Sequence, residues 1–151
     1  MKVQTTLIQL LRMAFACLFV LLTGCASNLP KHIGLNQHQL PLCPSSPNCV
    51  SSYDMDEEHY IKPILFSSSQ KNITHQLINI FSEHSNIELI SLSNNYIHAQ
   101  YSSNMMGFID DIELLILDQK IHIRSASRLG YSDFGANRKH IEMIRTQLQQ
   151  H

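Results

Sequence analysis

GFIDDIELLILDQKIHIRSAS, residues 107–127, contains two strand-like runs rich in isoleucine and leucine, separated by Asp118-Gln119. A two-residue turn at that point makes the runs an antiparallel hairpin. One face of the hairpin is then apolar except at its end, because it pairs Ile116 with Ile121, Leu114 with Ile123, Ile112 with Ser125, and Asp110 with Ser127. The opposite face sets Glu113 across from Arg124, and also pairs Leu115 with His122, Asp111 with Ala126, and Ile109 with Arg128.

Two earlier runs, residues 87–92 and 96–102, extend the apolar face. A turn at Asn104-Met105 pairs Tyr101 with Phe108, Ala99 with Asp110, and Ile97 with Ile112, while a turn at Asn94-Asn95 pairs Leu92 with Ile97 and Ile90 with Ala99. A slip of one residue in any strand would mix the two faces. The agreement of the three hairpins therefore predicts a four-stranded antiparallel meander.

Helical spacing flanks these strands on both sides. Residues 67–84 place four apolar side chains on one stripe, namely Ile73, Leu77, Ile80 and Phe81. Residues 134–149 have a comparable stripe, formed by Phe134, Asn137, Ile141, Ile144 and Leu148. The order α-β-β-β-β-α predicts an α+β fold, a two-layer sandwich in which the four-stranded antiparallel meander sheet carries both helices on one face.

Two features of this predicted sheet require contacts from elsewhere, namely a carboxylate on its buried face and apolar side chains on its outer face. Asp110 falls on the buried face, where an ionised carboxylate without donors would be costly, so we expect Ser127 and the turn after it to supply them. The outer face carries too many apolar side chains for a bare surface, namely Leu89, Ile109, Leu115 and Leu117. Either residues 43–66 cross that face or another chain does, and the segment is the simpler explanation.

The first 24 residues have the outline of a secretory signal. Lys2 and Arg12 are followed by an uninterrupted apolar run at 13–22, which is far shorter than the ~20 residues that cross a bilayer. Leu22-Thr23-Gly24-Cys25 resembles the lipobox of bacterial lipoproteins, which implies cleavage before Cys25 and lipid attachment to it; an ordinary secretory signal is the alternative. The following Ala26 resembles the sorting signal for the outer membrane. We therefore expect a protein anchored in the outer membrane through Cys25, facing the periplasm.

After the leader, residues 25–42 read as the lipidated cysteine and a tether with two prolines, and residues 43–151 as a single domain. Cys43 and Cys49 flank a turn-rich loop, and in an oxidising periplasm they most simply form a disulfide. A metal site and free thiols are the alternatives, although C-x5-C is not the usual zinc spacing.

Composition excludes some functions. Charged residues make up only 15% of the chain and the formal net charge is −1, which argues against a nucleic-acid partner. The 9 histidines are scattered, and no pair has the H-x3-H spacing of a helical metal site. We expect no metal and no cofactor.

The densest polar stretch, IHIRSASRLGYSDFGANR at residues 121–138, leaves the last strand and enters the last helix. A helix N-terminus with arginines beside it suits an anion. In the structural alternative, Asp133 caps the helix and Gly130 and Gly135 permit tight backbone geometry.

Several segments resemble one family: CPSSPNCVSS, HYIKPI, YIHAQYSS, GFIDDIELL and IHIRSASRLGYSDFGANRKHIEMIR. They are similar to the domain-of-unknown-function 1499 family over about residues 41–148. Its long closing motif, S-A-S-R-x-G-x-S-D-x-G-x-N-R, is met throughout, and the aspartate pair of the family is met by Asp110 and Asp111. The resemblance implies no established activity.

Two functions remain open. The first is a non-catalytic, membrane-anchored binding module, whose partner is an anionic small molecule or another envelope protein. Its candidate ligand-binding residues are Asp110, Asp111, Arg124, Ser125, Ser127, Arg128, Asp133, Asn137 and Arg138. The second is a hydrolase or transferase with Asp110 as base and Ser125 or Ser127 as nucleophile. His98, expected on the outer face opposite Asp111, lies on the wrong side for those serines.

Overall fold

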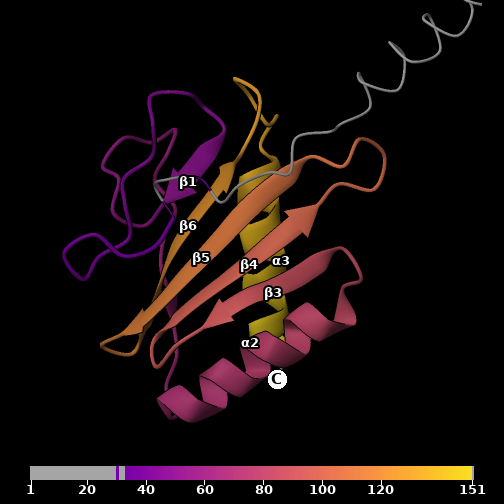
Figure 1. Cartoon of the computed structure of the whole chain (residues 1–151). Helices are drawn as coiled ribbons and strands as arrows, with labels where there is room; N and C mark the ends of the chain where they lie inside the picture. Colours follow the sequence, from indigo (N-terminus) through magenta and orange to yellow (C-terminus); the bar gives the residue numbers. More distant parts are fainter. Residues whose placement is uncertain (1–29, 31–32, 151) are drawn as a thin grey trace, which may run out of the picture.

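The computed structural model describes Pro30 and residues 33–150 (Figure 1). The predictions for the leader, for Cys25 and for the start of the tether lie outside the described residues. Within them the chain has two helices and a six-stranded antiparallel sheet, an α+β fold. No helix in this part of the chain combines the length and the hydropathy of a membrane span.

The predicted meander is present as β3 (Ile87–Leu92), β4 (Tyr96–Ser102), β5 (Ile109–Leu117) and β6 (Lys120–Ser127). The four-strand count was wrong, however. β1 (Cys49–Ser51) and β2 (Ile64–Leu65) pair with the two ends of β6, which gives the order β1-β6-β5-β4-β3 with β2 beside β6. These added strands have three and two residues, too few to show an alternating pattern in the sequence.

The predicted β5–β6 register is confirmed, including Ile112 with Ser125, Glu113 with Arg124 and Asp110 with Ser127. The turn between β5 and β6 explains why this register was predicted correctly. Asp118 and Gln119 have φ angles of 51° and 60°, and two consecutive positive φ angles define the tight type I′ turn whose twist suits a two-residue hairpin.

The predicted β4–β5 register was wrong by two residues. Ala99 pairs with Ile112 and Tyr101 with Asp110, because residues 103–108 form a six-residue loop in place of a two-residue turn. Its backbone is closed by hydrogen bonds from Ser103 N to Phe108 O and from Gly107 N to Ser103 O, of 2.9 and 3.0 Å. Since the shift is even, every side chain stays on its expected face.

In the β3–β4 pair, the predicted contact of Leu92 with Ile97 is confirmed, but Ala99 pairs with Leu89 and not with Ile90. A β-bulge between Leu89 and Ser91 inserts one extra residue on β3.

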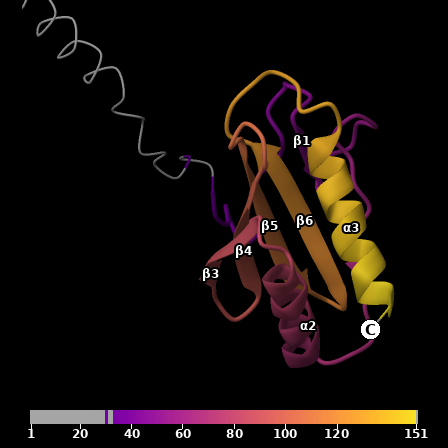
Figure 2. The ribbon, with the colours of Figure 1, turned by 90° about the vertical axis from the view of Figure 1, so that its right-hand side faces the viewer.

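Helices α2 (Gln70–Glu83) and α3 (Ala136–Gln150) cover the same face of the sheet (Figure 2). The Ser69 side chain caps α2 by accepting a hydrogen bond from Asn72 N at 3.3 Å. α3 begins two residues later than expected, because Phe134 and Gly135 have φ angles of 54° and 78°, which no right-handed helix contains. Between the helices and the sheet lies the hydrophobic core, which includes Leu77, Ile97, Ile123, Ile141 and Ile144.

The outer face of the sheet is also covered, so two layers do not describe the whole fold. Gly34 N donates to Glu113 Oε1 at 2.7 Å, Leu40 is buried, and the Tyr53 ring stacks on His122 with centroids 4.8 Å apart. Residues within 33–54 thus cross this face, earlier in the chain than the expected 43–66, and part of the expected tether packs on the domain. All described elements and buried core residues lie within 40–150, so a chain that begins at residue 26 keeps the complete fold.

Candidate functional site

The residues of the closing motif gather where β6 ends and α3 begins. Asn137, fully buried in the first turn of α3, is their centre, with five hydrogen bonds. Its side-chain nitrogen lies 3.0 Å from Asn48 O and 2.9 Å from both Ser127 Oγ and Asp133 Oδ2, and its oxygen accepts from Ser125 Oγ. Asp133 also accepts from the Asn137 backbone at 2.8 Å, as expected of a helix cap.

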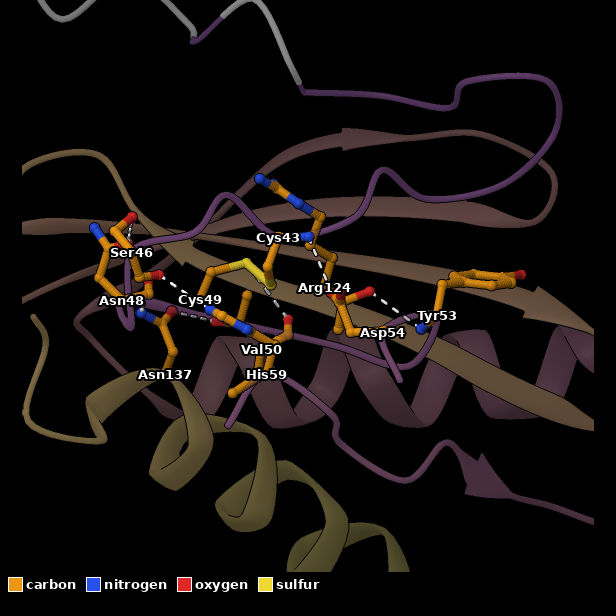
Figure 3. The surroundings of a disulfide bond; sticks show 12 residues. Cys43, Ser46, Asn48, Cys49, Val50, Tyr53, Asp54, His59, Arg124 and Asn137 are labelled. Carbon is orange, nitrogen blue, oxygen red and sulfur yellow. Dashed lines mark hydrogen bonds between the residues drawn. A yellow bond between two sulfur atoms is a disulfide. The ribbon is translucent and has the colours of Figure 1, made fainter. Parts of the chain in front are cut away.

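The predicted disulfide between Cys43 and Cys49 is confirmed, with an S–S distance of 2.05 Å (Figure 3). It closes the loop that presents Asn48 to the motif. Asn48 O accepts from Asn137, and Asn48 Nδ2 donates to Gly130 O at 2.7 Å. The cysteine loop and the closing motif are therefore one hydrogen-bonded unit, although about ninety residues separate them, which is why the sequence showed them as two.

Arg124, directly before the motif, and the motif's Arg128 and Arg138 are bonded to the chain itself. Arg124 Nη1 donates to Glu113 Oε2 at 2.8 Å, and Arg128 donates from Nε and Nη2 to the two oxygens of Asp111, each at 2.8 Å. Arg138 donates to the carbonyl oxygens of Tyr60 and Glu58, at 2.9 and 3.0 Å. These bonds use the donors that an anion would need.

His98 Nε2 lies 2.7 Å from Asp111 Oδ1, and both side chains are buried under the outer layer. The expected proximity of these two residues is found, although His98 pairs in register with Glu113. Burial alone would raise the pKa of Asp111, but hydrogen bonds and charge from Arg128 and His98 outweigh it and lower that pKa. Asp111 is thus a buried, ion-paired carboxylate on the face opposite α3.

Asp110 lies on the other face, under the start of α3, with its side chain only 9% exposed. As expected, the Ser127 side chain supplies a hydrogen bond. His140 Nδ1 lies 3.5 Å from Asp110 Oδ2, and the His140 ring stacks on Tyr101 with centroids 3.7 Å apart. That nitrogen is buried and has no hydrogen-bond partner within the described chain.

Both ionisable groups are shifted toward their neutral forms. Burial, with smaller contributions from Asp133 and Asp111, raises the pKa of Asp110 in spite of the Ser127 hydrogen bond. Burial lowers the pKa of His140 to about 4. A carboxyl with a raised pKa beside a neutral imidazole can both accept and donate hydrogen bonds, which is typical of functional sites.

These groups line a pocket of about 330 Å³ between the 103–108 loop and the 129–135 loop. Polar groups come from Asp110, Ser127, Asp133 and His140, and apolar walls from Tyr101, Phe108, Leu129 and Phe134. Sequence reasoning missed Tyr101 and His140. The helical stripe could have found His140, because it lies one turn after Asn137 on α3.

The structure therefore divides the nine candidate ligand-binding residues. Asp110, Ser127 and Asp133 line the pocket; Ser125 and Asn137 are buried in the hydrogen-bond network; Asp111, Arg124 and Arg128 form ion pairs; and Arg138 holds residues 58–60. Within residues 33–150 no group of three or more histidine, cysteine or acidic side chains is arranged to hold a metal ion.

A larger hollow, of about 740 Å³, lies between residues 62–68 and the adjoining parts of α2 and α3. Lys62 and Arg145 bring positive charge to its lining, and Arg145 donates to Glu142 Oε2 and to the carbonyl oxygens of Pro63 and Lys62. None of the buried, unpartnered polar atoms of the described chain lines this hollow, so its size does not make it the better site.

The sequence model of the family described as protein of unknown function (DUF1499) matches residues 39–148. The chain belongs to this family. The match spans the disulfide loop, the whole sheet, α2 and all but the last two residues of α3, so the network around Asn137 and the Asp110 pocket lie inside the family domain. No curated protein matches the chain.

Proposed function

We propose that the chain is a bacterial envelope lipoprotein, anchored through a lipid on Cys25 in the outer membrane and facing the periplasm, that acts as a non-catalytic binding module. The signal-like leader and the lipobox support the anchor. The pocket between the 103–108 and 129–135 loops supports the binding site, which is the strand-to-helix turn indicated by the sequence.

The observation that carries the binding role is the floor of this pocket. Asp110 and His140 both line a cavity of about 330 Å³, and the buried His140 Nδ1, which has no hydrogen-bond partner within the described chain, lies 3.5 Å from Asp110 Oδ2. Buried polar groups normally have hydrogen-bond partners, and a ligand that brings a donor would supply one here.

The charges and walls define the ligand class. Asp110 and Asp133 bring two carboxylates to the pocket, whereas the nearby arginines are paired with the chain. Tyr101 and Phe108 add aromatic faces, which attract cations. A small polar ligand with an ammonium or hydroxyl group therefore fits better than the anion that the sequence suggested.

The alternative is a hydrolase or transferase that uses Asp110 with Ser125 or Ser127. One observation favours it, namely the hydrogen bond between Ser127 and the carboxyl of Asp110, whose pKa is raised. In this arrangement, however, the aspartate lies between the serine and the histidine, whereas a Ser-His-Asp triad places the histidine between the other two.

The test titrates the chain from residue 26 with ethanolammonium chloride, choline chloride and sodium phosphate, and follows backbone amide NMR shifts. We expect the two ammonium ions to shift residues 108–110 and 127–136, and phosphate to leave them unchanged. Asp110→Asn should weaken ammonium binding about tenfold, since a hydrogen bond to a charged group contributes about 1.5–3 kcal/mol. Asp118→Asn is the matched control, because Asp118 lies in the β5–β6 turn and asparagine tolerates its φ of 51°.

Two outcomes would overturn the proposal. Phosphate binding without ammonium binding would favour an anion site. Turnover of p-nitrophenyl acetate or p-nitrophenyl phosphate that is lost in Ser127→Ala and kept in Asp118→Asn would favour the hydrolase.

A further inference from the structure

Two loops project from the same end of the sheet (Figure 1). One joins β4 to β5 at residues 103–108, and the other joins β6 to α3 at residues 128–135. They lie together because the flanking pairs, Ser102 with Ile109 and Asp110 with Ser127, are at one end of neighbouring strands. We call residues 103–108 and 129–135 the apolar loop pair.

The large side chains of the apolar loop pair point into solvent. Met105 is 94% exposed and Phe134 91%, and four more are well exposed: Met106, Phe108, Leu129 and Tyr131. The thirteen residues of the pair contain one charged side chain, Asp133, which accepts hydrogen bonds at the start of α3. Soluble proteins rarely gather so many exposed apolar groups without a partner.

The other end of the sheet differs. Its turns, residues 93–95 and 118–119, are polar, with Asn94, Asn95 and Asp118. Exposed leucines occur there as well, at positions 65, 92 and 117, but they belong to strands, and Leu65 and Leu117 pair with the charged Lys120. The two ends are thus chemically distinct, and Leu65 provides a control for exposure alone.

We propose that the apolar loop pair inserts into the surface of a lipid bilayer. Side chains that are more than nine-tenths exposed at loop tips protrude singly, as insertion between lipid head groups requires, and do not form a flat face for a protein. Tyr131 is of the aromatic kind that is enriched at the membrane interface, and Phe134 adds an apolar ring of the kind that interfacial segments bury. This inference goes beyond the proposed function, because it places a second membrane contact on the folded domain itself.

The reach of the chain allows both contacts at once. Gly34 is held at Glu113, the midpoint of β5, four residues from the loop end at Ile109, or about 14 Å along the strand. Gly34 lies nine positions after Cys25, a stretch that can span up to about 30 Å when extended. A lipid on Cys25, as proposed above, can therefore enter the bilayer that the loops touch.

The charge of the loops predicts how they bind. Because the apolar loop pair contains no lysine or arginine, and the adjoining Arg128 is paired with Asp111, attraction to anionic lipid contributes little. Partition into vesicles should therefore be similar with and without anionic lipid, and should persist at high salt. The pocket of Asp110 opens between the same loops, so its mouth would face the lipid.

Tryptophan fluorescence tests this directly, because the chain has no tryptophan of its own. The unlipidated chain from residue 26 would carry Met105→Trp as reporter or Leu65→Trp as control. The vesicles would be of phosphatidylcholine alone, or mixed equally with phosphatidylglycerol. We expect Met105→Trp emission to move to shorter wavelength with both vesicles and to be quenched by lipids brominated on the acyl chains, and Leu65→Trp emission to stay unchanged.

A second substitution measures how much one loop side chain contributes to membrane binding. Met106→Ser in the Met105→Trp chain should lower the vesicle partition coefficient about tenfold, the effect of withdrawing one large apolar side chain from lipid. Met106 is not in the pocket lining, and no ammonium ligand is used, so failure here and failure of the proposed function are separate results.

Three outcomes would overturn the inference. One is an equal response, or none, from the two reporters. Another is partition that needs phosphatidylglycerol and is lost in salt. The third is a spectral shift without vesicles that grows with protein concentration, since that would identify the loops as a contact between copies of the chain.

Discussion

The guanidinium of Arg124 on β6 donates a hydrogen bond of 2.8 Å to the carboxylate of Glu113 on β5, and both side chains are buried. The second Glu113 oxygen accepts from Tyr96 Oη at 2.8 Å and from Gly34 N at 2.7 Å. The pair thus joins two central strands to the segment that covers them. Charges in such a place are tolerated because they are paired with each other, although Arg124 Nε is buried without a hydrogen-bond partner within the described chain.

Arg124→Met should lower the free energy of unfolding by about 3–5 kcal/mol, because it leaves the Glu113 carboxylate buried without its cation. Replacing both partners, as Glu113→Leu with Arg124→Met, should restore much of that loss. Urea unfolding followed by circular dichroism measures both. A single variant as stable as the parent would show that water reaches this pair.

Asn137→Ala should cost about 3 kcal/mol, because it leaves the Ser125 hydroxyl and Asn48 carbonyl without their partner in a buried place. Asn79→Ala is the control, since Asn79 is exposed on α2 and should change stability by less than about 0.5 kcal/mol. Similar unfolding midpoints for the two variants would contradict a central role of Asn137.

His140 makes stability depend on pH. Its pKa in the folded protein is about 4, below the ordinary 6.5, so between these values the unfolded chain binds more protons. Stability should therefore fall as the pH is lowered from 6.5 to 4. Asp110, whose pKa is raised, acts with the opposite sign as the pH rises above 3.8.

Comparison with His140→Phe isolates this contribution, because phenylalanine keeps a ring against Tyr101 and does not titrate. The unfolding temperature of the parent chain should fall by about 4 °C more than that of the variant across this range. His75→Gln, an exposed change on α2, should behave as the parent does. Parallel curves for the parent and His140→Phe would exclude a buried, neutral His140.

The disulfide should stabilise the domain by constraining the unfolded chain. For a loop of seven residues the chain-entropy estimate is about 2 kcal/mol, which Cys43→Ala with Cys49→Ala should remove. A reducing agent should destabilise the parent by a similar amount and leave the double variant unchanged. If the reductant also destabilised the double variant, its effect on the parent could not be assigned to the Cys43–Cys49 disulfide.

Cys25→Ser tests the proposed anchor. In a bacterial host, the parent chain should partition into the detergent phase of Triton X-114 and incorporate labelled palmitate, and the variant should lose the label, because serine has no thiol for the acylglyceryl group. Cys17→Ser, within the expected leader, should leave labelling intact. Labelling that survives Cys25→Ser would place the lipid on another residue.

The sequence predicted best where its pattern was local. The β5–β6 hairpin was correct to the residue, because a two-residue turn ties register to the side-chain period. The β4–β5 loop was missed because its register shift of two residues leaves the alternation of apolar and polar side chains unchanged. The bulge near Ile90 was missed because it interrupts that alternation at a single residue. Two short strands were missed because they exist only through pairing with β6.

The candidate pocket lies at the strand-to-helix turn that the sequence indicated, but its lining is acidic and not basic. The closing motif does lead to a pocket, but Arg124, Arg128 and Arg138 were assigned to a ligand, whereas they bind Glu113, Asp111 and two backbone carbonyls. A sequence shows that arginine is present and not which acceptors the fold brings to it. His140 lies at the pocket for a similar reason, because the fold packs α3 so that its ring stacks on Tyr101.

The strand order has a consequence for the membrane-anchored state proposed above. Copies of an anchored protein are confined to two dimensions, where an exposed sheet edge could recruit a strand from a neighbour and start aggregation. In the described sheet, β1 and β2 occupy the edge at β6, and the edge strand β3 carries a bulge with Glu88 and Ser91 exposed. Bulges and charges on edge strands oppose such pairing. The irregular parts of this sheet therefore protect its edges from intermolecular strand addition.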